Sequence, residues 1–389
     1  MRKLSGAQSN TSNPDVLIIG GGLHGLSASI HLSLAGFRCS IIEKDYSGRH
    51  ASGVNAGGVR RLGRHSAEIP LSSAALDYWH RMVDWLGDDC GFVPCDQIKV
   101  AETEDELSLL EQRVSSLKQS GYDHELMIDR DQLRGLVPAL STHCQGAIWC
   151  PGDGSANPFR TVCAFRNRAI ELGVSIHNDH VVKSVKRQGN VWEVGTHCQE
   201  FQAPIIINAA GAWGNKIANM IGDDVPMQAE AFMLMITERV KPMLTQVLGA
   251  TGRTLSFKQF DNGTFMIGGG HIGHADRVSN QALVDTRGLS TSAHTVKSLF
   301  PQLNNIKINR FWAGLEGVTP DGIPVIGPAR NADNAYHVFG FCGHGFQLSP
   351  ITGHILTQLV EAGNSSLSID SFRVDRFSQL DVHKDSNKQ

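Results

Sequence analysis

The chain of 389 residues is 41% hydrophobic and 19% charged, which is typical of a soluble globular protein with a large core. That length predicts two or three domains. A formal net charge of −3 and a pI near 6.6 argue against nucleic acid as a partner, and no apolar run is long enough for a membrane span.

The N-terminal segment and the cysteines indicate the compartment. Residues 1–14 lack the apolar stretch of a signal peptide, and we expect a disordered tail there. The eight cysteines are scattered and form no CxxC pair, which favours free thiols in the cytoplasm over disulfides or a zinc site. His271 and His274 have metal-like spacing without a partner set of carboxylates or cysteines, so we expect no metal.

The first regular elements predict a strand, a glycine turn, a helix and a second strand. Apolar residues fill 16–19, leucine and isoleucine recur at helical spacing over 23–34, and "CSIIEK" follows. Gly20, Gly22 and Gly25 have the GxGxxG spacing of a dinucleotide-binding turn. The first glycine permits the tight turn, the second lets amides approach a pyrophosphate, and the third lets the helix pack closely on the strand.

An acidic residue completes this pattern. Glu43 ends the second strand, 18 residues after Gly25, where a carboxylate can bind the ribose hydroxyls. Sites for NAD and FAD look alike at this level, so these residues leave the choice between the two open. The alternative is a glycine-rich turn without a ligand.

The rest of the chain alternates between the two kinds of regular structure. A glycine-rich basic loop precedes helical patterns at 71–86, 107–117 and 158–172. Residues 174–209 are strand-rich and contain a Gly189-Asn190 turn, and residues 225–318 are mostly β. The end returns to strand, glycine turn and helix, which predicts a discontinuous cofactor domain with another domain inserted.

The predicted boundaries follow from these patterns. We expect a disordered tail at residues 1–14 and a C-terminal tail at residues 366–389. The FAD-binding domain is discontinuous and comprises residues 15–75, 146–222 and 319–365. The substrate domain comprises residues 76–145 and 223–318.

Five motifs, in order, resemble a known family. They are "DVLIIGGGLHGLSAS", "ASGVNAGGVRRLG", "INAAGAWG", "FWAGLEGVTPDGIPVIG" and "GFCGHGFQLSP". Together they resemble the FAD-dependent D-amino-acid oxidase family, in the branch of glycine oxidase, sarcosine oxidase and dehydrogenase, and the β subunits of opine and proline dehydrogenases. The resemblance implies an α/β fold with a Rossmann-like FAD-binding domain and an inserted mixed α+β substrate domain.

The resemblance also implies the reaction. The substrate would be a small amino or imino acid (an opine, an N-methylated, cyclic or D-amino acid), oxidised at its C–N bond to an imine. In this family the neutral amine loses its α-hydrogen as a hydride to flavin N5. Once the amine has lost its proton, no dedicated general base is required.

The family's FAD contacts transfer to specific positions. Gly20, Gly22 and Gly25 would meet the pyrophosphate and Glu43 the adenosine ribose. The isoalloxazine would be contacted by Ser52, Asn55, Gly57 and Gly58. Val181 would contact adenine, and Gly211 would contact the ribityl chain. The pyrimidine edge of the flavin would be contacted by Gly343, Gly345, Phe346 and Gln347.

Two further features concern the flavin. A helix that begins after "GHGFQ" would direct its amides and positive dipole end at the negatively charged reduced flavin. Relatives with FAD linked to histidine carry that histidine where Asn55 stands, so we expect non-covalent FAD. His50 is the alternative point of attachment.

Arginine suits the substrate carboxylate because of its bidentate fork. Arg60, Arg61 and Arg64 lie in the flavin loop, and Arg60 best matches the arginine of sarcosine oxidases. The alternative is a solvated loop or a contact to the FAD phosphates. Arg310 is a second candidate for the anchor.

Other side chains have two interpretations. His344 either contacts the cofactor or substrate or has a structural role. Gln347 stands where sarcosine oxidases often have a lysine that holds the substrate carboxylate. Trp312, Phe341 and Phe346 form pocket walls or simple core.

The electron acceptor is left open. Met266 loosely matches the place where monomeric sarcosine oxidases have an oxygen-activating lysine, which favours a dehydrogenase. The alternatives are an oxidase that produces hydrogen peroxide, a flavin subunit of a hetero-oligomeric electron-transfer dehydrogenase, and an NAD-dependent Rossmann dehydrogenase.

Overall fold

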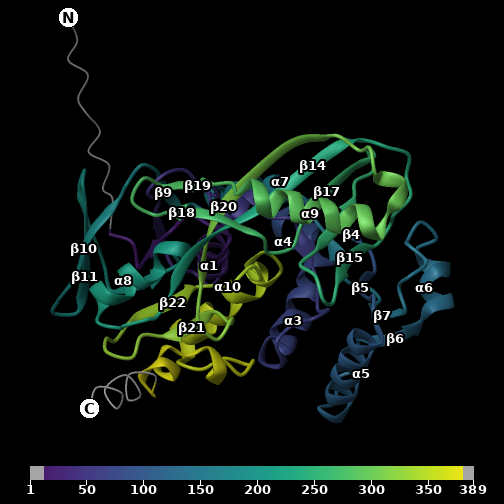
Figure 1. Cartoon of the computed structure of the whole chain (residues 1–389). Coiled ribbons are helices and arrows are strands. Elements are labelled where there is room, and N and C mark those ends of the chain that lie inside the picture. The colour runs from purple at the N-terminus through teal and green to yellow at the C-terminus, as the bar shows by residue number, and fades with distance from the viewer. Residues whose placement is uncertain (1–12, 380–389) are drawn as a thin grey trace, which may run out of the picture.

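The structure, a computed structural model, describes residues 13–379. The expected N-terminal tail therefore lies, apart from its last two residues, outside the described residues. Two large sheets organise the described chain, and each has its own hydrophobic core (Figure 1).

The first sheet joins segments from both ends of the chain. Its strand order is β21-β22-β13-β1-β2-β9, and every neighbouring pair is parallel except β21 with β22. The strands are β1 (Val16–Ile19), β2 (Cys39–Ile42), β9 (Ser175–His177), β13 (Ile205–Asn208), β21 (Val325–Pro328) and β22 (Ala335–Phe339). A mostly parallel sheet built from distant segments confirms the Rossmann-like, discontinuous domain.

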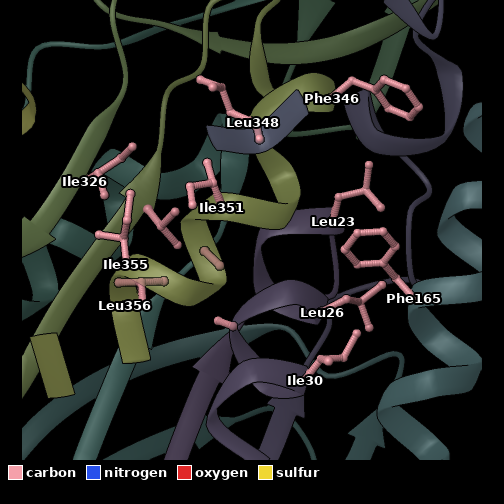
Figure 2. Close-up of a cluster of buried hydrophobic side chains, with 14 of the residues drawn as sticks. Leu23, Leu26, Ile30, Phe165, Ile326, Phe346, Leu348, Ile351, Ile355 and Leu356 are labelled. Atoms are coloured by element: carbon pink, nitrogen blue, oxygen red, sulfur yellow. The ribbon is translucent and has the colours of Figure 1, made fainter. Parts of the chain in front are cut away.

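Helices cover one face of this sheet. They are α1 (Leu23–Leu34), α3 (Ile69–Trp79), α4 (Met82–Leu86), α7 (Pro158–Glu171) and α10 (Gly345–Ala362). Figure 2 shows Leu23, Leu26 and Ile30 of α1 beside Phe165 of α7, close to the apolar residues of α10. The other face packs against α8 (Gly214–Ile221) and the antiparallel sheet of β10 (Val182–Gln188), β11 (Val191–Thr196) and β12 (Glu200–Ala203).

The second sheet carries the inserted domain. Its order is β19-β18-β14-β17-β16-β15-β5-β7-β6, with β20 beside β14. The strands are β5 (Gln97–Ala101), β6 (Leu126–Asp129), β7 (Gly146–Cys150), β14 (Gln228–Arg239), β15 (Val247–Ala250), β16 (Ser256–Gln259), β17 (Thr264–Gly268), β18 (Ile272–Asp276), β19 (Gln281–Leu283) and β20 (Ile308–Val318). Helices α5 (Glu104–Gln119), α6 (Arg130–Leu136) and α9 (Thr286–Leu299) pack against it.

Short elements connect the two parts. Helix α2 (Ala51–Val54) leads into β3 (Gly58–Val59), which pairs through β8 (Gly154–Ser155) with β4 (Val93–Pro94). The expected domain boundaries shift accordingly. Residue 75 falls inside α3, which packs against α10, and residues 146–150 form a strand of the second sheet rather than of the first.

Two sequence expectations concern the surroundings of the protein. Among the helices of residues 13–379, none combines the length and apolarity that crossing a bilayer requires. All eight cysteines are free thiols. The cytoplasmic location stays a prediction.

The expected C-terminal tail begins as a packed segment. Two 3-10 turns, η4 (Asp370–Phe372) and η5 (Val374–Gln379), lie against the first sheet and its helices. Phe372 is 1% exposed and Phe377 is 4% exposed. Apolar side chains at spacings too irregular for a helical pattern hold this segment, which explains why the sequence did not reveal it. Residues 380–389 lie outside the described residues.

We expect Phe372→Ala to lower the free energy of unfolding by about 3–5 kcal/mol, because it leaves a cavity in the core shared with α10. Urea unfolding followed by tryptophan fluorescence measures this change. Phe159→Ala is the matched control, since that ring is 74% exposed at the start of α7 and its loss should change stability by less than about 0.5 kcal/mol. Equal effects of the two variants would contradict the packed position of Phe372.

Candidate active site

A cavity of about 1040 Å³ lies between the two sheets. One side is formed by the loops at the carboxyl ends of β1, β2, β13 and β22 and by the segment from residue 48 to residue 64. The other side is formed by residues of β5, β14, β15 and β20. A cavity at the carboxyl ends of parallel strands is where open α/β sheets bind their ligands.

The glycine turn after β1 is sterically fixed. Gly20 has φ +111°, and a Cβ there would lie 2.3 Å from the carbonyl oxygen of Ala209. A Cβ on Gly25 would lie 1.9 Å from the carbonyl oxygen of Gly20, so α1 can pack against the turn only without a side chain. Gly22 instead faces the cavity, and a Cβ there would lie 3.0 Å from the Ser52 hydroxyl.

Glu43 follows β2 and is 7% exposed. Its Oε2 accepts a hydrogen bond of 2.6 Å from the Gly21 amide, and its Oε1 accepts one of 2.8 Å from the Asp45 amide. Burial raises the pKa of Glu43, and these amide hydrogen bonds oppose the shift. The carboxylate thus ties the glycine turn to β2 and lines the cavity.

The loop of residues 52–58 is held by its own polar groups. The Ser52 hydroxyl accepts a hydrogen bond of 3.0 Å from the Leu23 amide at the start of α1. Asn55 donates to the carbonyls of Ala51 and Ser52, and its Oδ1 accepts 2.7 Å from the Gly57 amide. Asn55 therefore shapes the loop that runs along the cavity.

The three arginines of the basic loop separate in the structure. Arg61 pairs with buried Asp153 at 3.1 Å and does not line the cavity, whereas Arg60 and Arg64 do. Arg64 is 2% exposed, and it donates to the Arg60 carbonyl at 3.0 Å and to Gln347 Oε1 at 3.3 Å. Burial and the charge of Arg60 lower the pKa of Arg64 to about 9, and its buried Nη1 has no partner among the described residues.

The glycine turn before α10 closes the same end of the cavity. His344 precedes the helix, and its Nδ1 lies 3.1 Å from Oε2 of the buried Glu68. Burial, with the charges of Arg64 and Arg60, lowers the pKa of His344 to about 4, so its imidazole is neutral near pH 7. The helix begins at Gly345, three residues earlier than the sequence predicts.

This earlier start changes the position of Gln347. Its side chain is fully buried in the first turn of α10, where Nε2 donates 2.7 Å to the Ser72 carbonyl and Oε1 accepts from Arg64. The side chain of Gln347 therefore does not line the cavity, and its expected contact with cofactor or substrate stays a prediction. Gln347 holds Arg64 instead.

Most of the predicted site residues do meet in the cavity. Those that line it are Gly20, Gly22, Glu43, Ser52, Asn55, Gly57, Gly58, Arg60, Val181, Gly211, Gly343, His344, Gly345 and Phe346. Gly25 packs beneath the turn, as its predicted role in helix–strand packing requires. Arg310 is exposed and six residues along β20 from Glu316, about 20 Å away in an extended strand, so it is not part of this site.

The predicted aromatic walls also separate. Phe341 and Phe346 line the cavity, whereas Trp312 lies outside it and donates to the Val54 carbonyl at 2.9 Å. Within the described chain, no group of three histidine, cysteine, aspartate or glutamate side chains is arranged to hold a metal ion.

Sequence reasoning missed two acidic residues. Glu68 is fully buried against His344, and Glu316 lines the cavity from β20. Glu316 stands in the quoted motif "FWAGLEGVTPDGIPVIG", and a charged residue between Gly314 and Gly317 in an apolar strand was the available signal.

The residues present fit a dinucleotide. The Gly22 cradle at the N-terminus of α1 leaves room for a pyrophosphate that a side chain would fill. At the other end, the unpartnered Arg64 Nη1 offers a donor for a negatively charged group. The cavity lining runs from Val181 to Phe346, so one extended ligand can contact both ends.

Comparison with known proteins decides the family. Residues 15–359 match the family described as DAO, FAD dependent oxidoreductase. The chain belongs to this DAO family. The alternative of a nicotinamide dehydrogenase is therefore wrong, and FAD is the cofactor.

DAO-family relatives span nearly the whole chain. An opine oxidase subunit of Rhizobium meliloti is 25% identical, over 93% of this chain and 97% of the relative. A hydrogen cyanide synthase subunit of Pseudomonas aeruginosa is 27% identical, over 93% and 96%. The chain is an FAD-dependent amino-acid oxidoreductase that acts on a C–N bond.

Solved DAO-family structures confirm the fold. Glycine oxidase from Geobacillus kaustophilus superposes with a TM-score of 0.86 at 23% identity, over 94% of this chain and 99% of that one. L-Proline dehydrogenase from P. horikoshii gives 0.87 at 23% identity, over 95% and 98%.

Proposed function

We propose that this enzyme oxidises the C–N bond of a small amino or imino acid to an imine, and that it works as a dehydrogenase. The substrate class comprises opines and N-methylated, cyclic or D-amino acids. One observation carries the proposal: Arg60 and Arg64 face the same cavity as the dinucleotide-type glycine turn.

The chain's own residues hold the cofactor in this proposal. The α1 turn at Gly20 and Gly22 binds the pyrophosphate, while Glu43 and Val181 bind the adenosine. The segments 52–58 and 343–346, with Gly211, surround the flavin and its ribityl chain. Bound FAD supplies the acceptor, at N5, for the hydride that leaves the substrate carbon.

Arg60 binds the substrate carboxylate. Its guanidinium is a charged donor in a partly buried position, where ion pairs are screened less than at the surface. The Arg64 carbonyl, which accepts 3.0 Å from Arg113, and the Arg61–Asp153 pair fix the loop on both sides. Such fixed donors hold a substrate in one orientation.

Met266 supports a dehydrogenase. It is 7% exposed on β17, does not line the cavity, and carries no charge with which to assist oxygen. One observation favours the alternative of an oxidase. Lys258 is the direct cross-strand partner of Met266, and its buried Nζ has no hydrogen-bond partner in the described part of the chain.

Anaerobic titration of the yellow protein with sarcosine, glycine, D-alanine, proline, octopine and nopaline tests this function. We expect one compound to bleach the flavin absorption and the colour to return slowly in air. Rapid return would identify an oxidase. A flavin that no amino or imino acid bleaches would overturn the proposed function.

Partner chains are part of the proposal. The relatives from opine oxidase, sarcosine oxidase and hydrogen cyanide synthase are each named as one subunit of a larger enzyme. We propose that this chain, too, passes electrons to another protein chain. Turnover that appears only after addition of such a chain or of an artificial acceptor would support this role.

We expect the FAD to be non-covalent. Asn55 uses its amide within its own loop, and His50 lies beside Lys44 and Asp45. Neither side chain is placed as a free nucleophile toward the cavity. Acid precipitation should therefore release all the flavin into the supernatant, and a yellow pellet that fluoresces after digestion would contradict this expectation.

A further inference from the structure

Glu316 is a carboxyl group in the cavity wall that the proposed function does not yet use. Among the described residues that line the cavity, only Glu43 and Glu316 are acidic. Both oxygens of Glu43 accept backbone amides, and the proposed function assigns that carboxylate to the adenosine of the cofactor. Glu316 is the acidic side chain that remains for the substrate.

Glu316 is held by one oxygen. Its Oε1 accepts a hydrogen bond of 2.7 Å from the Gly343 amide, which lies in the turn before α10. No hydrogen bond to Oε2 is present within residues 13–379, and the side chain is only partly buried because it faces the cavity. One oxygen thus fixes the orientation while the other is available.

Glu230 stands directly opposite Glu316 on the neighbouring strand β14. Burial and, secondarily, this like charge raise the pKa of Glu316 to about 7, against the opposing effect of the Gly343 amide. The carboxyl therefore exchanges its proton near neutrality, as a group that receives and returns protons must.

Other ionisable groups are packed around β20. The turn contributes Cys342, whose pKa burial raises, and His344, whose pKa burial lowers to about 4. Strand β18 carries His274 and Asp276, while α2, β19 and the 3-10 turn η2 (Gly211–Trp213) carry no ionisable side chain. Within the part of the cavity wall formed by β20 and the turn before α10, Glu316 is the ionisable group whose pKa lies near 7.

Cationic groups lie at the same end of the cavity. The charges of Arg64 and Arg60 act on His344, the residue next to Gly343. An amino or imino acid carries a carboxylate and an ammonium group on one carbon. A pair of guanidinium donors and one carboxylate acceptor at one end of a cavity match these two charges.

We propose that Glu316 binds the substrate's ammonium group and accepts the proton that this group loses before the C–N bond is oxidised. This role rests on the proposed function. The N–H bond of the ammonium breaks, an O–H bond forms at Glu316 Oε2, and no electrons are exchanged. The neutral amine then has the lone pair that stabilises positive charge as the hydride departs.

The pH dependence of anaerobic flavin reduction tests the role in the FAD-loaded protein. In the wild type, the second-order rate constant should rise about tenfold per pH unit and level off above about 7. In Glu316→Gln it should be roughly 10- to 100-fold lower at pH 7 and continue to rise toward the pKa of the substrate's own amine. In Glu316→Asp the rate constant should again level off at high pH, at a value between those of Glu316→Gln and the wild type.

Glu230→Gln is the matched control. It removes the like charge from the opposite strand without changing a residue of the cavity lining. The rate constant at high pH should stay at the wild-type level. The pH range over which the rate constant rises should move to lower pH, because Glu316 ionises more easily. A structural role for Glu316 predicts no such shift.

A binding measurement gives a second readout. Acetate and benzoate, which lack an amine, should perturb the flavin spectrum, and their affinity should fall as the pH rises through about 7, because ionised Glu316 repels the anion. In Glu316→Gln this fall should be absent.

The possible outcomes are distinguishable. In one outcome, amino acids bleach the wild type and the Glu316→Gln variant keeps the wild-type pH dependence of flavin reduction. That result overturns only the role of Glu316. A wild type that no amine bleaches overturns the proposed function as well. If Glu316→Gln does not bind FAD, the wild-type anion titration decides, and the absence of a break near pH 7 overturns the role.

Discussion

Gly25→Ala should yield a colourless protein. The new Cβ would lie 1.9 Å from the Gly20 carbonyl oxygen, so α1 must move away from the turn that binds the pyrophosphate. Backbone on both sides leaves no flexible side chain to yield. We expect the free energy of unfolding to fall by about 3 kcal/mol and the affinity for FAD to fall at least about 100-fold. Flavin absorbance after gel filtration, with a titration of added FAD, measures the second effect.

Gly135→Ala is the control for this substitution. Gly135 lies in α6, where a Cβ would meet no atom within 4 Å. Alanine should stabilise that helix by up to about 1 kcal/mol and leave FAD binding unchanged. If Gly25→Ala also bound FAD with the wild-type affinity, the packing role of Gly25 would be wrong.

Arg60→Met should raise the KM for the amino-acid substrate by roughly 100-fold while the protein remains yellow. The guanidinium offers charged hydrogen bonds to the substrate carboxylate, each worth about 1.5–3 kcal/mol, and methionine removes them at similar length. Stopped-flow bleaching at varied substrate concentration separates the binding constant from the limiting rate. We expect the larger change in the binding constant.

Arg310→Met is the matched control for Arg60. That arginine is exposed near the far end of β20 and outside the cavity, so KM should not change. An unchanged KM in Arg60→Met with retained flavin would transfer the anchoring role to Arg64, whose Nη1 is unpartnered among the described residues.

Local patterns predicted the cofactor half of this fold well. The GxGxxG turn, the helix that follows it and the C-terminal glycine turn are all encoded by neighbouring residues, and each is present. The second sheet was harder to predict because its pairings are long-range. β5 pairs in parallel with β15, for example, and nothing near residue 97 indicates a partner near residue 247.

The errors at the site have physical causes. Gln347 was placed at the flavin by the family resemblance, whereas the helix start at Gly345 turns its side chain toward Ser72 and Arg64. Arg310 was placed there because it adjoins a motif, but an extended strand carries it away from the cavity. Helices α3 and α4 were predicted as one, since a single apolar periodicity continues across the break at residues 80–81.

The order of strands in the first sheet has a consequence for synthesis of the protein. Strand β1 is synthesised before β13 and can pair with one edge of it. The other edge of β13 pairs with β22, which begins at Ala335 and is synthesised much later. A ribosome-bound chain therefore exposes an unpaired strand edge until β22 has been made. The turn at 343–346 emerges later still, so FAD can be enclosed only after that turn has been made. Scarcity of flavin at that moment would leave newly made chains, rather than finished enzyme, open to aggregation and proteolysis.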